Sequence, residues 1–172
     1  VFVGGNILAD EKGVCFIVDS DRRFNSTEND YAAAYGCKAV RLMKHVSGIG
    51  DIDEVLKPIG HNTILTNTPE YVDQLKSWGY NVVQLPSAKT PSYQDRTYNN
   101  SLILNGTVFM PVYSMPTDDE AAAVYQKLGY KVVRIPSTDM SDNFSGSVHC
   151  QTMAYPAMNQ ADLFSVLQIQ PF

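Results

Sequence analysis

The stretch that decides the fold is Trp78-Gly79-Tyr80-Asn81-Val82-Val83-Gln84-Leu85-Pro86-Ser87, which recurs fifty residues later as Leu128-Gly129-Tyr130-Lys131-Val132-Val133-Arg134-Ile135-Pro136-Ser137. The two copies share the pattern Gly-Tyr-x-Val-Val-x-aliphatic-Pro-Ser, and a looser third copy runs from Tyr35 to Leu42. Chance is a poor explanation for agreement at every informative position, because self-similarity at a fixed period is typical of repeat architectures. The sequence therefore predicts a fold built from repeated units.

Each copy has the same sequence context. Helical stretches precede the repeated glycine at 28–35, 69–77 and 117–128, with start signals at Thr68 and Thr117 and stop signals at Gly36, Gly79 and Gly129. Two short strands precede each helix, at 6–9 and 14–18, at 52–56 and 63–66, and at 102–104 and 107–110. The predicted unit is β-β-α-β, present three times, and a fourth unit begins at Ser145 with its first strand alone.

These units predict one incomplete α/β domain over residues 1–156, with repeats at approximately 1–44, 45–95, 96–140 and 141–156. The remaining segment, 157–172, contains a short amphipathic run after Pro156. We expect this C-terminal extension to pack on the domain or on a partner.

The first strand of each unit is unusual because it begins with polar residues, where a buried strand needs apolar ones. The corresponding segments are Gly4-Gly5-Asn6, Gly50-Asp51-Ile52-Asp53, Tyr98-Asn99-Asn100 and Gly146-Ser147-Val148-His149-Cys150. If the units surround a pseudo-rotation axis, these segments converge on one point. Carboxylates, amides and one thiol that converge in this way predict a binding site.

Cys150 is the nucleophile candidate in that site. It lies in a polar segment, 146–152, that we expect to be a strand, so that the side chain of the preceding His149 points to the opposite face. The other two cysteines leave two alternatives open: Cys15 and Cys37 form a disulfide, or both are buried reduced thiols.

Composition excludes several classes of partner. The 172-residue chain has 44% hydrophobic residues, a net charge of −5 and no basic cluster among its 13 lysines and arginines, so neither nucleic acid nor a membrane surface is an expected partner. No apolar run approaches the length that spans a membrane. The three histidines have no neighbours at metal-ligand spacing, so we expect no metal and no cofactor.

The sequence has four Asn-x-Ser/Thr triplets, at Asn25, Asn99, Asn105 and Asn143. They are candidate glycosylation sites and favour a secreted protein, although a chain rich in Asn, Ser and Thr also makes such triplets by chance, which leaves a cytoplasmic location open. The first residues, Val1 to Gly5, include neither an initiator Met nor a basic first segment, which is expected of a processed or truncated start.

The chain resembles the guanidine-modifying (pentein) superfamily, which includes protein-arginine deiminases, agmatine deiminases and arginine deiminase. Gly4-Gly5-Asn6 resembles the family's Gly-Gly-Asn strand, and 50–54 its Gly-His-x-Asp-Glu strand. Residues 100–111 resemble its Asn-x-Leu-x-x-Asn-x-x-x-x-x-Pro segment, and 146–152 its Gly-x-x-His-Cys-x-Thr nucleophile strand. The resemblance implies an α/β-propeller of five ββαβ units, of which about three and a half are present.

The resemblance also implies a reaction and its residues. Cys150 would attack the carbon of a guanidinium group and form a thiouronium that water hydrolyses to a ureido product. Asp53 matches the family's binding carboxylate, and Asn6, Asn100 and Ser147 are further substrate-binding candidates. Asp51 stands where the family has a catalytic His, so it becomes the candidate acid/base group.

Two departures from the family leave alternatives open. Besides Asp51 in place of His, the family's first guanidinium-binding acid lies upstream of the matched region, and the ring is short by more than one unit. We expect the N-terminal remainder of the same precursor or another subunit to complete it. The chain is then an active deiminase of arginine, peptidyl-arginine or agmatine, or an inactive relative that binds guanidino groups or serves as a structural module. The third alternative is a secreted glycoprotein scaffold in which Cys150 has no catalytic role.

Overall fold

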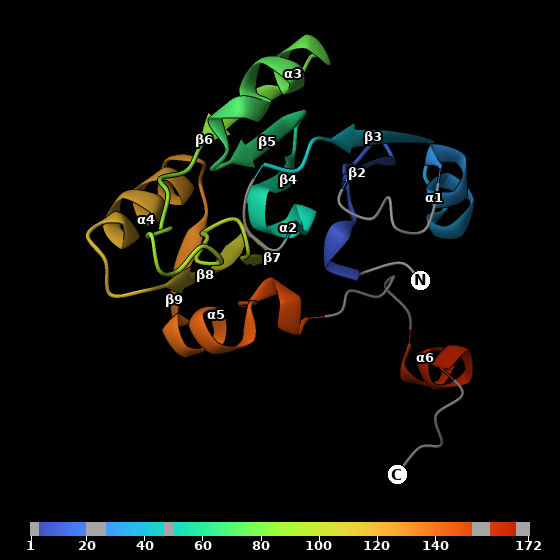
Figure 1. Cartoon of the computed structure of the whole chain (residues 1–172). Helices are drawn as coiled ribbons and strands as arrows, with labels where there is room; N and C mark the ends of the chain where they lie inside the picture. Colours follow the sequence, from blue (N-terminus) through green and yellow to red (C-terminus); the bar gives the residue numbers. More distant parts are fainter. Residues whose placement is uncertain (1–3, 20–26, 47–49, 153–158, 168–172) are drawn as a thin grey trace.

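Three small sheets of the same topology follow one another along the chain in the computed structural model, which describes residues 4–19, 27–46, 50–152 and 159–167 (Figure 1). The first unit contains β1 (Leu8–Ala9), β2 (Val14–Val18), α1 (Glu28–Tyr35) and β3 (Ala39–Met43). The second contains β4 (Leu56–Gly60), β5 (Thr63–Thr66), α3 (Val72–Ser77) and β6 (Asn81–Gln84). The third contains β7 (Leu102–Leu104), β8 (Thr107–Val112), α4 (Thr117–Lys127) and β9 (Lys131–Pro136).

Strand pairing is the same in every unit. The middle strand pairs antiparallel with the first strand through a hairpin and parallel with the last strand, which the helix returns to it. Parallel pairing requires a crossover connection, and the helix before the repeated glycine supplies it. The predicted β-β-α-β repeat is therefore confirmed.

Local signals explain most helix ends. Thr27 and Asp30 form a reciprocal capping box at the start of α1, and Gly36 ends that helix in the left-handed region at φ 69°. The expected start signals of the other two helices differ in detail. Thr68 precedes a 3-10 turn, η3 (Pro69–Tyr71), without a capping hydrogen bond, and Thr117 is the first residue of α4, with Pro116 at the cap position.

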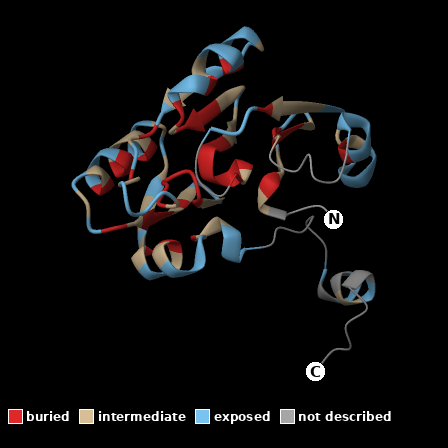
Figure 2. Cartoon of the chain, viewed as in Figure 1, coloured by how far each residue is buried: buried red, intermediate tan, exposed pale blue. Residues whose placement is uncertain are grey.

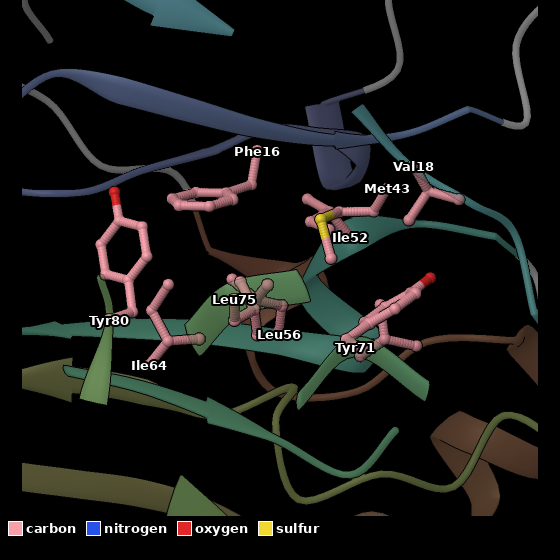
Figure 3. Close-up of a cluster of buried hydrophobic side chains, with 10 residues drawn as sticks. Phe16, Val18, Met43, Ile52, Leu56, Ile64, Tyr71, Leu75 and Tyr80 are labelled. Carbon is pink, nitrogen blue, oxygen red and sulfur yellow. The ribbon is translucent and has the colours of Figure 1, made fainter. Parts of the chain in front are cut away.

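Two apolar cores lie between neighbouring units. The first combines Phe16 and Val18 of β2 with Ile64 of β5 and Leu75 of α3 (Figure 3). The next residue of β5, Leu65, belongs to the second core, which α4 and β8 also form. Because successive side chains of a strand point to opposite faces, β5 contributes to both cores, and Figure 2 shows this strand mostly in the colour of buried residues.

A disulfide joins Cys15 of β2 to Cys37, just after α1, with sulfur atoms 1.98 Å apart. Of the two alternatives that the sequence left open, the structure therefore has the bridge. Cys150 is the free cysteine of this three-cysteine chain.

The polar segments at the unit starts are not strands, and this part of the prediction was wrong. Gly4–Asn6 forms a 3-10 turn (η1), Ile52–Val55 a short helix (α2), and His149–Gln151 another 3-10 turn (η4). A helix not foreseen, α5 (Thr138–Phe144), leads into η4. Short helical turns direct successive side chains around an axis, whereas a strand would divide them between two faces.

Helix α6 (Gln160–Leu167) covers the amphipathic run of the C-terminal extension. In Figure 1 it lies apart from the three sheets. Its packing on the domain or on a partner stays a prediction. Among the described residues, no helix combines the length and apolar character needed to cross a membrane.

The sequon at Asn99 is buried, which contradicts its role as a glycosylation site in the folded chain. Asn99 is 0% exposed, and its amide nitrogen lies 3.4 Å from the carbonyl oxygen of Glu54. A glycan needs a surface side chain. Asn105 and Asn143 are exposed and stay candidates, while Asn25 lies outside the described residues.

Arg96 ties the approach to β7 onto α5. Its Nε and Nη2 atoms donate to the two carboxylate oxygens of Asp142 at 2.8 and 2.6 Å, and the side chains are only 11% and 12% exposed. A two-point pair of this kind holds its partners in one geometry. It anchors the helix from which the nucleophile segment continues.

We expect Arg96→Ala to lower the free energy of unfolding by roughly 2–3 kcal/mol, because it leaves the Asp142 carboxylate partly buried without its partner. The matched control is Arg134→Ala, which breaks a pair with Asp119 whose side chains are 48% and 81% exposed. That loss should stay within about 1 kcal/mol. Urea unfolding measures both variants, and equal losses would contradict a structural role for the Arg96 pair.

Candidate active site

Asp53 of α2 is the centre of a polar cluster between the units. Its side chain is fully buried, and its Oδ2 atom lies 2.8 Å from Nδ1 of His149 and 3.5 Å from Sγ of Cys150. The structure gives its buried Oδ1 atom no hydrogen-bond partner. A buried carboxylate oxygen without a donor is costly, so this atom is suited to accept an N–H group from a ligand.

Asn100, in the segment between β6 and β7, holds the nucleophile segment. Its Nδ2 atom donates to Sγ of Cys150 at 2.9 Å. Its Oδ1 atom accepts the backbone N–H groups of His149 at 2.9 Å and Cys150 at 3.3 Å. Since Asn100 is fully buried, these contacts fix the thiol in one position beside Asp53.

The surroundings of Cys150 favour the neutral thiol in the unliganded site. Cys150 as a residue is exposed, but partial desolvation of its sulfur and the negative charge of Asp53 raise the pKa of the thiol to about 11, against the opposing effect of hydrogen bonds from the Ser147 backbone and the Asn100 amide. A cation bound against Asp53 would offset that charge and lower the pKa. The site is therefore arranged so that a cationic ligand favours the reactive thiolate.

His149 faces the site, which corrects the expectation that it points away from Cys150. The expectation assumed a strand, in which neighbouring side chains take opposite faces. Residues His149–Gln151 instead form a 3-10 turn, in which neighbours are about a third of a turn apart. Both His149 and Cys150 can therefore contact the same oxygen of Asp53.

A pocket of about 320 Å³ opens beside this cluster. Its walls are partly polar and partly apolar, and they include Gly5, Asp51, Met140, Phe144, Cys150 and Gln151. Asp51, at the start of α2, brings a second carboxylate into the lining of the pocket that Cys150 also lines. Gly5 allows this approach, because a Cβ atom there would lie 2.6 Å from Oδ2 of Asp51 and 3.4 Å from Oδ1 of Asp53.

The structure places two further predicted substrate-binding residues, Asn6 and Ser147, away from the pocket lining. The side-chain amide of Asn6 donates to the Val18 carbonyl and accepts from the Val18 N–H, both at 2.9 Å, so it holds η1 against β2. Ser147 is 1% exposed and, like Asp53, is not among the residues that line the pocket, so its role in substrate binding stays a prediction. Its contribution is the backbone hydrogen bond that lowers the pKa of Cys150.

Lys57 of β4 is a site residue that sequence reasoning missed. Its ammonium group is buried and donates to the Ser101 carbonyl at 2.6 Å, one residue beyond Asn100. The signal in the sequence was a lysine inside the apolar run Val55-Leu56-Lys57-Pro58-Ile59. Within the described part of the chain, no group of three His, Cys, Asp or Glu residues could hold a metal ion.

Comparison with known proteins identifies the family. The family model for Porphyromonas-type peptidyl-arginine deiminases matches residues 48–156, which is more than half of the chain and includes α2, Asn100 and Cys150. The chain belongs to this deiminase family. The predicted membership of the pentein superfamily is thereby confirmed.

Agmatine deiminases are among the proteins of known function whose sequences are similar to this chain. The protein from Pseudomonas aeruginosa is 31% identical over 96 residues, which cover 54% of this chain and 26% of the relative. The protein from Pseudomonas fluorescens is 30% identical over 92 residues, which cover 52% of this chain and 25% of the relative. The matched region therefore spans about a quarter of the length of these relatives.

Solved deiminase structures superpose on this chain and share its fold. Agmatine deiminase from C. jejuni superposes with a TM-score of 0.72 at 22% identity, over 87% of this chain and 54% of that one. A candidate arginine deiminase from Porphyromonas gingivalis superposes with a TM-score of 0.72 at 26% identity, over 89% and 56%. The chain thus corresponds to about half of these deiminase structures.

Proposed function

We propose that the complete protein hydrolyses the guanidinium group of an arginine-type compound to a ureido group and ammonia. The observation that carries this proposal is the contact of Cys150 with both Asn100 and Asp53, at 2.9 and 3.5 Å. A fixed thiol beside a buried carboxylate is the pairing that a cationic, planar substrate with a carbon electrophile requires. Family membership supports the same class of substrate.

In the first half of the reaction the guanidinium N–H groups bind the Asp53 carboxylate, and the Cys150 thiolate forms a C–S bond to the guanidinium carbon. One C–N bond then breaks, and its electron pair and a proton leave with the nitrogen as ammonia. Water attacks the resulting thiouronium and loses a proton to a base. The C–S bond breaks, which returns the thiolate and releases the ureido product.

We assign the proton transfers to Asp51, because this carboxyl group lines the pocket together with Cys150. His149 acts through Asp53, since the 2.8 Å contact from its Nδ1 atom orients the carboxylate. The family resemblance places a histidine at position 51. A carboxyl group is a weaker match to proton transfer near neutral pH than an imidazole, so we expect slow turnover.

The rest of the protein completes the site in this proposal. The three units described here, together with units outside this chain, would form the five-unit α/β-propeller that the family resemblance implies. The additional units come from the same precursor or from another subunit, and they supply a further carboxylate for the substrate. Support comes from the solved deiminases, of whose chains this one covers 54% and 56%.

We also propose that the protein works outside the cytoplasm. The Cys15–Cys37 disulfide supports this location, because disulfides persist in oxidising compartments. Asn105 and Asn143 are exposed and available for glycans.

A second candidate function is a guanidino-binding module without turnover. Two observations favour it: Asp51 stands at the position of the expected histidine, and the pKa of Cys150 is raised to about 11. Binding through Asp53 needs neither an imidazole nor a thiolate.

The two functions are separated by an assay of the complete protein with arginine, agmatine and an arginine-containing peptide. We expect ureido product from at least one substrate, and we expect Cys150→Ala to abolish it while binding of that substrate remains, because the thiol forms the covalent bond and Asp53 the main contact. Colorimetric detection of the ureido group and calorimetric titration measure the two effects. Binding without product above the Cys150→Ala background would establish the module.

A further inference from the structure

Lys57 is a buried cation that the proposed reaction does not use. It is 5% exposed, and it lies on β4, the strand that continues directly from the α2 helix of Asp53. Removing a lysine from water is expensive unless the ammonium group gains specific partners. An apolar side chain of similar length would fill the same space without that cost. The positive charge of Lys57 must therefore be stabilised by specific partners in the site.

The first partner of Lys57 is the segment that holds the nucleophile. Its Nζ atom donates to the Ser101 carbonyl at 2.6 Å. The preceding residue, Asn100, donates to Sγ of Cys150 at 2.9 Å and accepts from the Cys150 backbone. Lys57 is therefore linked to Asn100, the residue that positions the thiol, through its hydrogen bond to the neighbouring Ser101.

The second partner is the negative charge of the site. Burial lowers the pKa of Lys57 to about 8, while the charges of Asp53 and of the Cys150 thiolate act in the opposite direction. These two groups, from α2 and η4, are the titratable groups that act on Lys57. Two further charged groups lie at the edge of the cluster: His149 contacts Asp53, and Asp51 lines the pocket with Cys150.

We propose that Lys57 is a positioning residue for Cys150, which holds the Asn100–Ser101 segment in register with the thiol and supplies the positive charge that favours the thiolate. The proposal rests on the proposed role of Cys150 as nucleophile. Lys57 lies beneath the site and does not line the pocket, so it does not occupy the position of a cationic substrate. Its charge offsets part of the negative charge that Asp53 and the thiolate bring to the site.

The test is the rate at which iodoacetamide alkylates Cys150 between pH 6 and pH 10, in the complete protein with the Cys15–Cys37 bridge intact. Because Cys150 is the free cysteine of this chain, the alkylated peptide containing it is quantified by mass spectrometry. Below pH 8, where Lys57 carries its charge, we expect alkylation to be roughly tenfold slower in Lys57→Met than in the wild type. Above pH 8 the ratio should fall toward one, because the wild-type lysine loses its proton.

Three variants make the result specific. Lys57→Arg keeps its charge at all these pH values, so its advantage over Lys57→Met should persist above pH 8. Asn100→Ala removes a hydrogen bond to the thiol and should slow alkylation by a factor that does not change near pH 8. Lys131→Met, at an exposed position of β9, should match the wild type.

A ratio near one below pH 8, or alkylation of Lys57→Arg as slow as that of Lys57→Met, would overturn the charge role of Lys57. Melting temperatures of all variants report any loss of folding, and Lys57→Arg keeps the test decisive if Lys57→Met unfolds. Alkylation needs no turnover. Failure of this inference is therefore distinguishable from failure of the proposed hydrolase activity, which the ureido assay measures.

Discussion

Asp51→His is expected to raise the rate of ureido formation by the complete protein by roughly a hundred- to ten-thousand-fold. The imidazole pKa lies near neutrality, so the new side chain can give a proton to departing ammonia and take one from water. An imidazolium next to Cys150 also lowers the pKa of the thiol, whereas the Asp51 carboxylate cannot. Initial rates with the best substrate, measured from pH 5 to pH 9, check this result.

The substitution should leave the fold intact. Asp51 occupies the cap position of α2 without a side-chain capping hydrogen bond, and its side chain lines the open pocket. Asp51→Asn is the matched control, because it removes the charge without adding an acid/base group. If Asp51→His has the rate of Asp51→Asn, the proton transfers do not depend on position 51, and the acid/base assignment is wrong.

Asp53→Asn is expected to lower turnover of the substrate but to make the Cys150 thiol more reactive toward an alkylating reagent. Turnover and substrate affinity should fall, with kcat/KM reduced on the order of a hundred- to a thousandfold, because the guanidinium loses its buried carboxylate. The pKa of Cys150 should decrease from about 11, since the charge of Asp53 and its hydrogen bond to the thiol both raise it. At pH 8, where roughly one thiol in a thousand is ionised at a pKa of about 11, alkylation of Cys150 should become about tenfold faster.

Asp10→Asn is the control for this pair of measurements. Asp10 is also a buried carboxylate, but it accepts a hydrogen bond from Tyr80 at 2.6 Å between the first two units, outside the pocket. Its replacement should reduce stability without accelerating alkylation. If Asp53→Asn slows alkylation as well as turnover, the charge of Asp53 does not control the thiol, and a general disturbance of the site explains the loss.

Much of the fold could be predicted because its signals are local. The glycine after each helix, the turn residues of each hairpin and the β-branched last strands all act within a few residues, so the three β-β-α-β units could be located correctly. The polar unit starts were harder. At the start of the second unit, Asp51 and Asp53 alternate across the apolar Ile52, which also fits a strand, and only packing between units decides that the segment becomes the helix α2.

Part of the site could be predicted because the repeated units mark corresponding positions in the sequence. Asp53, Asn100 and Cys150 stand at corresponding positions of their units, so the repeat and the family motifs pointed to them before any contact was known. Asn6 shares that position but uses its amide on Val18, which no repeat pattern can show. Lys57 carries no motif, and its importance follows only from its burial next to Ser101.

The sequence by itself determined the repeat, the helix and the last two strands of each unit, the family and the identity of the thiol, because these depend on residue type and short-range order. Only the tertiary structure decided how the thiol is surrounded. Its partners Asn100 and Asp53 are 50 and 97 residues away in the chain, and the 3-10 turn at His149–Gln151 brings His149 onto Asp53. Contacts across such separations arise from the packing of whole units against one another. This packing buries the apolar faces of the units and brings their polar first segments together.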